Sequence, residues 1–176
     1  MSDAVELWTV GHSTRTFDEF VSMLTAWRIE TLVDVRTVPR SRRHPHFNSD
    51  ALAAALPERS IAYVHLPELG GFRKPRADSA NMAWQNESFR GYADYMLTAD
   101  FAAALERLIA LAGASRAAIM CAEAVPWRCH RSLIADALTA RGHSVDHIMS
   151  ASNADTHRMT RFARIEHGRV TYPAML

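Results

Sequence analysis

The chain has 176 residues, of which 48% are hydrophobic, and its formal net charge is +1. This length and composition exclude a disordered protein and predict one globular domain, residues 1–176, with a continuous core. No apolar run approaches the length that crosses a membrane, and the first six residues lack the features of a signal peptide. We therefore expect a cytoplasmic protein with two reduced thiols and no membrane partner.

Strands and helices alternate through the first half of the chain. The apolar runs at residues 6–10, 31–35 and 61–66 each predict a strand. The spacing at residues 16–19 is that of a capping box and predicts a helix to about residue 27. Asn48 or Ser49 can cap a short helix over residues 50–56, after a loop that contains Pro45. Residues 68–87 show no clear period, and this length favours a binding loop or a lid over a simple connection.

The same alternation continues in the second half. Ser88 can cap a helix over residues 89–96, and a stronger helical pattern at 100–112 is expected to end at Gly113. Residues 117–121 predict a buried strand, residues 129–141 an amphipathic helix that ends at Gly142, and residues 144–148 a fifth strand. Two extended runs, 162–166 and 169–172, flank a two-residue turn and predict a terminal hairpin.

This order of elements predicts an α/β domain of three layers, with a mainly parallel sheet, helices on both faces and a C-terminal β-hairpin. The carboxyl ends of parallel strands meet at one edge, where ligands bind in such folds. The groups expected at this edge are His12 and Ser13, Asp34 to Arg36, His65 to Glu68, and Cys121 to Glu123. Among the residues at this edge and at the start of the helix predicted over residues 129–141, we interpret five as substrate-binding: His12, Ser13, Asp34, Arg36 and Arg131.

The segment at residues 117–134 places two cysteines around a turn between a strand and a helix. A cysteine on the first turn of a helix has its thiolate favoured by the helix dipole, and His130 and Arg131 would add to this effect at Cys129. Cys129 could therefore be a nucleophile, a metal ligand or a redox thiol. The alternative is that Cys129 and Cys121 are small buried apolar residues. The residues interpreted as catalytic are Cys121, Glu123, Cys129 and His130.

Glu123 follows directly after a buried strand, so its carboxylate must be solvated or paired. It could orient a substrate or act as a general base, and Arg131 could bind a phosphate. The alternative is a salt bridge between these two residues that only stabilises the turn. The pattern favours an enzyme that acts on a small anionic substrate, such as a nucleotide or another phosphate compound. It assigns no reaction, cofactor or oligomeric state.

Two other functions compete with this interpretation. Residues 36–76 carry eight basic and three acidic side chains, which suits a nucleic-acid-binding module that uses Arg40, Arg42, Arg43, Arg73, Lys74 and Arg76. The alternative is a coding bias toward arginine, since Lys74 is the only lysine. A metal-binding protein would use Cys121, Cys129 and histidines such as His12, but the spacing matches no paired ligand pattern, so no metal ligand is assigned.

Several motifs resemble a bacterial and archaeal family described as domain of unknown function 488. They are residues 9–13, residues 34–36 with Pro39 and Ser41, residues 69–71, the combination of Cys121-Ala122-Glu123 and Pro126 with Cys129-His130-Arg131, and the pairs Gly142-His143 and His147-Ile148. The resemblance implies a compact α/β domain with the cysteine segment as its functional centre. An association of some members with DNA repair adds slight weight to the nucleic-acid alternative.

Overall fold

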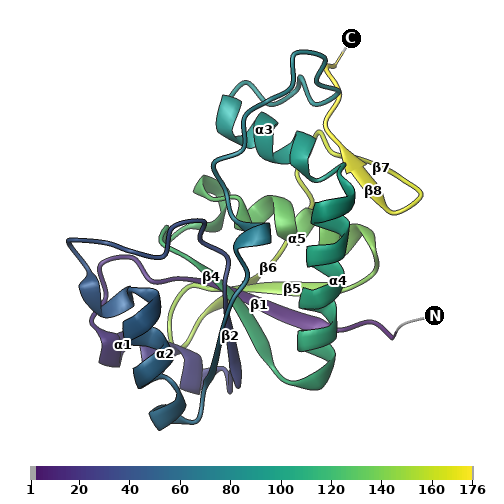
Figure 1. Ribbon diagram of the computed structural model, residues 1–176. Coiled ribbons are helices and arrows are strands. Elements are labelled where there is room, and N and C mark those ends of the chain that lie inside the picture. Colours follow the sequence, from purple (N-terminus) through teal and green to yellow (C-terminus); the bar gives the residue numbers. More distant parts are fainter. Residues whose placement is uncertain (1–2, 176) are drawn as a thin grey trace.

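The computed structural model describes residues 3–175. It has an α/β fold built on a six-stranded sheet in the order β3-β2-β4-β1-β5-β6 (Figure 1). The strands are β1 (Glu6–Gly11), β2 (Thr31–Asp34), β3 (Ala62–His65), β4 (Ala117–Cys121), β5 (Ser144–Ile148) and β6 (Ala154–Thr156). The first five strands are parallel, as predicted, and β6 pairs antiparallel with β5. The short edge strand β6 was not predicted, because its three residues are too few to show a pattern.

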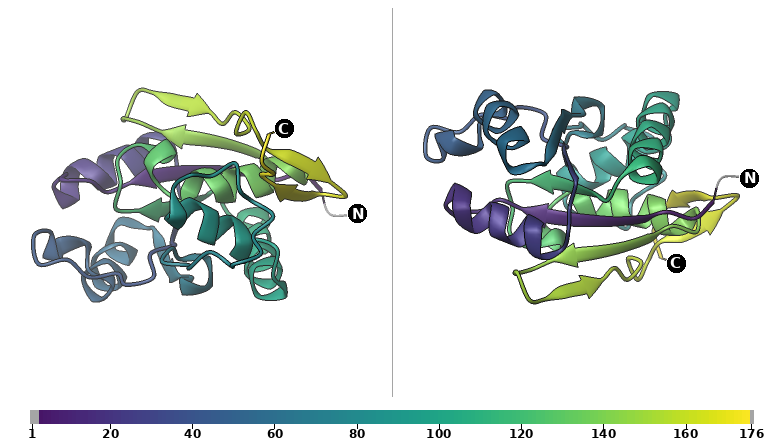
Figure 2. Two further views of the ribbon diagram at one scale, coloured as in Figure 1. Left: turned by 90° about the horizontal axis from the view of Figure 1, so that it is seen from above. Right: turned by 90° about the horizontal axis from the view of Figure 1, so that it is seen from below.

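Helices cover both faces of the sheet (Figure 2). They are α1 (Phe17–Ala26), α2 (Ser49–Ala55), α3 (Glu87–Tyr95), α4 (Ala99–Ala114) and α5 (Arg131–Ala140). Helices α1 and α2 enclose one apolar core with side chains such as Phe20 and Leu52. Helices α3, α4 and α5 enclose the other core, with Leu105 and Leu133. The two cores fix the sheet between two helical layers.

The predicted hairpin is present as β7 (Arg164–Glu166) and β8 (Arg169–Thr171). Its turn residues, His167 and Gly168, both have positive φ, which a two-residue turn of this kind requires. Within residues 3–175 no helix combines the length and the hydropathy needed to cross a membrane.

Three helix ends differ from the predictions. Asn86, not Ser88, caps α3, because its side chain accepts hydrogen bonds from the backbone N–H groups of Ser88 and Phe89. Helix α4 continues past Gly113, and Ser115 ends it. Helix α5 starts at Arg131, because Cys129 is extended after a 3-10 turn at Pro126–Arg128.

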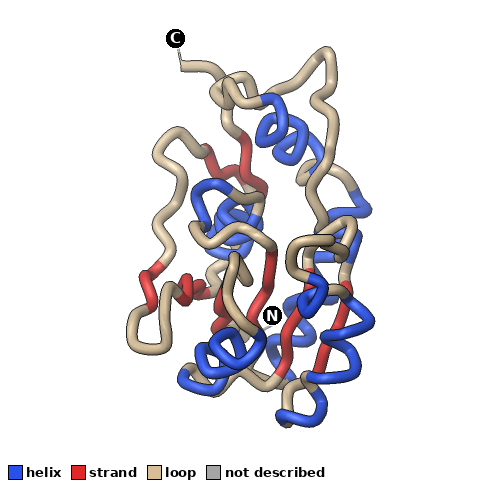
Figure 3. The backbone as a smooth tube through the Cα atoms, turned by 90° about the vertical axis from the view of Figure 1, so that its left-hand side faces the viewer, coloured by secondary structure: helices blue, strands red, loops and turns tan. Residues whose placement is uncertain are grey.

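The parallel strands all finish at the same edge of the sheet. Figure 3 looks onto this edge, and loops occupy much of the face that it shows. The connection from β3 to α3 contains no helix or strand except a 3-10 turn at Pro67–Leu69, in agreement with the predicted loop. Binding residues are concentrated in loops that a rigid sheet holds in place, so this edge is where a site is expected.

Candidate active site at the carboxyl edge of the sheet

The two cysteines meet at the carboxyl end of β4. The sulfur atoms of Cys121 and Cys129 are 2.7 Å apart, and both residues are free thiols. Both are buried, yet both line a cavity of about 450 Å³, which we call the main cavity. Its other lining residues are Arg36, Thr37, Val38, Gly71, Phe72, Asn86, Ser88, Phe89, Tyr92, Ala122, Glu123, Arg128 and His130. The segments predicted to meet at this edge therefore supply one concave surface.

The two thiols have different acidities. Burial by itself would raise the pKa of Cys129, but a hydrogen bond from Cys121 and the positive charge of Arg131 outweigh burial and lower the pKa to about 7. The backbone N–H of Arg131 also contributes to this lowering. Burial and the neighbouring Cys129 instead raise the pKa of Cys121 well above its ordinary value. Cys129 is therefore the more acidic thiol of the pair, and Cys121 is the thiol that keeps its proton.

His130 lies beside the sulfur of Cys129 with a defined tautomer. Its Nε2 is 3.0 Å from the carbonyl oxygen of Val35, which can only accept, so Nε2 carries the hydrogen. Burial lowers the pKa of His130, which keeps the ring neutral. The unprotonated Nδ1 lies 3.4 Å from the sulfur of Cys129. His130 is thus placed to accept the proton of the Cys129 thiol.

Arg131 is a fully buried cation that donates to a hydroxyl and to backbone carbonyl groups. It is 0% exposed and lines neither the main cavity nor the second cavity described below. Its guanidinium donates to Thr9 Oγ1 at 3.0 Å and to the carbonyl oxygen of Glu123 at 2.8 Å, and its Nε has no hydrogen-bond partner. The salt bridge to the Glu123 carboxylate that the sequence left open is not formed. We infer that Arg131 stabilises the thiolate of Cys129 and the turn after β4, and that it does not contact the substrate.

Gly11 allows this turn to lie against β1. A side chain at Gly11 would collide with the carbonyl group of Glu123, the group that accepts from Arg131. Backbone N–H groups of His12 and Ser13 donate to Cys121 and Ala122, which continues the pairing of β1 with β4 beyond the strands. The side chain of Glu123 is exposed and faces the main cavity.

A second cavity of about 420 Å³ lies beside the main one, and we call it the second cavity. Arg36, Val38, Ala122 and Glu123 line both cavities. The second cavity is also lined by His12, Ser13, Thr14, Arg40, Ser41, His44 and Ala124. Ser13 has a left-handed backbone with φ of 50°, an uncommon conformation for a residue with a side chain. The predicted substrate-binding residues His12, Ser13 and Arg36 therefore share a wall.

Asp34 holds Arg36 in this wall. Its two carboxylate oxygens accept from Nε and NH2 of Arg36 at 2.9 and 2.7 Å, and Tyr63 donates to it at 2.6 Å. Burial, followed by this bond to Asp34, raises the pKa of Tyr63 beyond its ordinary range. Burial lowers the pKa of His12 to about 4, so its neutral ring can accept from NH1 of Arg36 at 3.4 Å. Asp34 is thus a buried positioning residue, and one N–H of Arg36 NH1 is left for a ligand.

A series of buried polar groups behind Arg131 was not predicted as part of the site. Thr9 Oγ1 lies 2.6 Å from Nδ1 of His147, whose Nε2 lies 2.8 Å from Nδ1 of His157. Nε2 of His157 lies 2.8 Å from a carboxylate oxygen of Asp136. We call this series, from Arg131 to Asp136, the α5 network. No spacing in the sequence connects His147 with the cysteines.

The two ends of the α5 network have defined donors. The carboxylate of Asp136 accepts from Nε2 of His157. Thr9 in turn accepts from Arg131. Burial, with the neighbouring His157, lowers the pKa of His147 to about 3, which agrees with a neutral ring.

The two basic loops have different surroundings. Arg40, Arg42 and Arg43 are exposed, and their side chains form no ion pair within residues 3–175. In the other loop, Arg73 lies over the Tyr95 ring at 3.7 Å and donates to backbone carbonyls, and Arg76 is paired with Asp78. Lys74 is exposed. Only the first loop thus presents a cluster of unpaired arginines.

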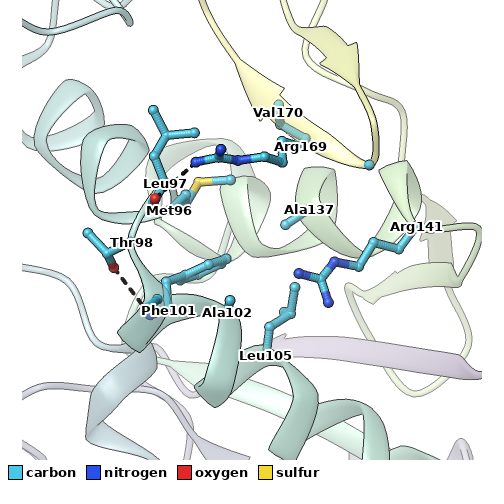
Figure 4. Close-up of a pocket in the computed structure, with 12 residues that line it drawn as sticks. Met96, Leu97, Thr98, Phe101, Ala102, Leu105, Ala137, Arg141, Arg169 and Val170 are labelled. Carbon is cyan, nitrogen blue, oxygen red and sulfur yellow. Dashed lines mark hydrogen bonds between the residues drawn. The ribbon is translucent and has the colours of Figure 1, made fainter.

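Two further observations limit the candidate sites. Within residues 3–175, no group of three or more His, Cys, Asp or Glu side chains is arranged to hold a metal ion, so the metal-binding alternative has no ligand set there. A separate cavity of about 330 Å³ lies between the start of α4, α5 and β8 (Figure 4). Its described lining carries Arg141 and Arg169 but no thiol, imidazole or carboxylate.

Comparison with known protein families assigns the chain. The family model described as "Domain of unknown function DUF488" matches residues 16–138. The chain belongs to the DUF488 family. This match spans Asp34, Arg36 and the whole segment from Cys121 to Arg131, whereas Thr9, His12 and His147 lie outside it. No curated protein and no solved structure matched the chain.

Proposed function

We propose that this DUF488 protein is a cysteine-dependent enzyme that acts on a small anionic substrate in the main cavity. The observation that carries the proposal is the position of the Cys129 sulfur. Cys129 lines the main cavity, and its sulfur lies 2.7 Å from the Cys121 sulfur and 3.4 Å from Nδ1 of His130. A thiolate is the reactive form of cysteine, and every one of these neighbours favours its formation or accepts its proton.

The roles of the other residues follow from where they lie. Arg36 and Arg128 would bind the negative charge of the substrate, since both line the main cavity. Glu123, which lines both cavities, would orient the substrate or act as a general base. His12 and Ser13 would contact the part of the substrate that enters the second cavity.

The rim of the main cavity favours a substrate with an apolar part. Phe72 is 88% exposed and Val38 is 61% exposed, although both are large apolar residues. Exposed apolar side chains that line a cavity are typical of ligand contacts. The substrate class that fits best therefore combines an anionic group with an aromatic or aliphatic group, as nucleotides do.

Alkylation of the thiols tests this proposal. Iodoacetamide labelling across pH, followed by peptide mass spectrometry, should show Cys129 reacting with an inflection near pH 7, while Cys121 reacts slowly. Nucleotides or other phosphate compounds that bind should protect Cys129, and Arg36→Met and Arg128→Met should weaken this protection. Equal slow labelling of both cysteines, with no protection by any compound in the panel, would overturn the proposal.

A second function is supported by one observation, the exposed and unpaired cluster of Arg40, Arg42 and Arg43. This cluster suits contacts with the phosphates of a nucleic acid. Arg40 also lines the second cavity, so the two functions would share a surface. Binding of long DNA or RNA that weakens steeply with salt would favour the nucleic-acid function over the enzyme.

A further inference from the structure

The contact between the two cysteine sulfurs is closer than catalysis by a single nucleophile needs. A disulfide bond is about 2.05 Å long, and the sulfurs of Cys121 and Cys129 are 2.7 Å apart. Once the shared thiol hydrogen has left, bond formation requires the two sulfurs to move only about 0.7 Å closer. Cys121 ends β4, and Cys129 lies in the loop before α5, which can supply this shift more readily than the strand.

The two thiols have the complementary roles that thiol–disulfide exchange requires. Cys129, beside Arg131 and His130, is the thiol that ionises and attacks first. Cys121 keeps its proton and lies within bonding reach of the Cys129 sulfur, so it can attack that sulfur second. Both cysteines line the main cavity, which is where a small disulfide would have to approach them.

We propose that Cys121 and Cys129 form a redox dithiol that reduces a small anionic disulfide bound in the main cavity. This proposal rests on the proposed function and names its substrate class. Arg36 and Arg128 provide the positive charge that would bind such a disulfide, and Phe72 provides an apolar contact. A carboxylate-bearing disulfide should therefore react faster than a cationic one of similar size.

The reaction balances in two exchanges. The Cys129 thiolate attacks one sulfur of the substrate R–S–S–R, which forms a mixed disulfide Cys129–S–S–R and releases R–S⁻. Cys121 loses its proton to this released thiolate and attacks the Cys129 sulfur, which forms the Cys121–Cys129 disulfide and releases a second R–S⁻. Two electrons pass from the dithiol to the substrate, which leaves as one thiol and one thiolate. An external dithiol would return the pair to its reduced state.

Dithiobis(nitrobenzoate), an aromatic disulfide with two carboxylates, provides the test because each released thiolate is coloured. The parent protein should release two coloured thiolates per chain and end without an adduct, having lost two hydrogen atoms by intact mass. Cys121→Ser keeps a hydroxyl beside Cys129 and should release one thiolate and keep one adduct. Cys129→Ser should react slowly, and dithiothreitol should restore the parent protein. Cystamine, a cationic disulfide, should oxidise the parent protein at least tenfold more slowly.

The outcomes separate this inference from the proposed function. If the parent protein retains one adduct or two, the intramolecular disulfide does not form and the dithiol proposal is wrong, while Cys129 can still be the nucleophile. If Cys129 is unreactive in both the parent protein and Cys121→Ser, the proposed function itself fails. Equal rates with the anionic and the cationic disulfide would overturn the assigned substrate charge.

Discussion

Arg131 and Asp136 lie on the same helix, α5, yet they are connected through residues outside it. The guanidinium of Arg131 donates to Thr9 on β1, and the network then passes through His147 and His157 to the carboxylate of Asp136. Asp136 is fully buried and also accepts from Thr160 and Tyr172. The carboxylate of Asp136 is therefore held by hydrogen bonds from His157, Thr160 and Tyr172.

The first prediction concerns this carboxylate. Asp136→Asn places an NH₂ group among donors and leaves at least one of them unsatisfied, so the free energy of unfolding should fall by about 2–4 kcal/mol. Urea denaturation measures the loss. Asp155→Asn, an exposed change nearby, serves as the control and should cost less than about 0.5 kcal/mol. A loss below 1 kcal/mol at Asp136 would contradict the importance of the α5 network for stability.

The second prediction is that the protein loses stability in mild acid. Burial lowers the pKa values of His12 and His147 from 6.5 to about 4 and about 3. The unfolded chain therefore binds these two protons more tightly than the folded protein does. The contribution of the two neutral histidines to the free energy of unfolding is fully present above about pH 6.5. It decreases as the pH falls below this value, by at most about 1.4 kcal/mol per pH unit for each histidine.

Denaturation in urea at several pH values between 7 and 5 checks this sign. His147→Gln removes one of the two titrating groups, so its stability should depend less steeply on pH than that of the parent protein, whatever its stability at pH 7. If the parent protein were equally stable at pH 5 and pH 7, the two histidines would be protonated at pH 5 as readily in the folded protein as in the unfolded chain.

The third prediction contrasts Glu123 with Arg131. Glu123→Gln should change the free energy of unfolding by less than about 0.5 kcal/mol, because its side chain is exposed. Arg131→Met removes the donor to Thr9 and to the Glu123 carbonyl group and should cost about 3 kcal/mol. Arg128→Met, a change at an exposed arginine, is the matched control. Thermal or urea unfolding distinguishes them, and similar stabilities for the two arginine variants would contradict the structural role of Arg131.

The fourth prediction tests the nucleic-acid function. Replacing Arg40, Arg42 and Arg43 together with alanine should leave the melting temperature nearly unchanged, since exposed unpaired charges contribute little to stability. If the cluster contacts phosphates, the affinity for DNA or RNA should fall at least tenfold, and the salt dependence of binding should become weaker. Fluorescence anisotropy at several salt concentrations measures both quantities. Unchanged binding by the triple variant would remove this function.

The sequence predicted the parallel sheet and its edge because apolar runs and turn residues are local signals. It also predicted that His12, Arg36 and the cysteine segment lie at that edge, because parallel strands end at the same edge of a sheet. It could not distinguish a carboxylate that faces solvent, Glu123, from one that is buried against an arginine, Asp34. It also could not connect Thr9, His147 and Asp136, because their contacts depend on how α5 packs on β1 and β5.

The same limit explains the change in role for Arg131. A helix start after a strand end is a common place for a ligand-binding arginine, so the pattern favoured contact with substrate. The side chain instead points inward, because its guanidinium donates hydrogen bonds to a hydroxyl on β1 and to two carbonyl groups in the turn after β4. The turn after β4 lies close against Gly11, and this contact fixes the position of the carbonyl acceptors. The sequence around Arg131 contains no signal of that contact.

The α5 network starts and ends on the same helix, and it therefore also determines the position of the Cys129 sulfur. The buried residues of α5 include Ala135 and Ala137, small residues whose shape defines little about how far a helix has slid or turned. Polar partners at both ends of the network remove that freedom, because a shift by one turn would separate both charged groups from their partners. The position of Cys129 at the cavity is thus set by directional hydrogen bonds from the adjoining helix, and loosening any of them should disturb that position before it unfolds the protein.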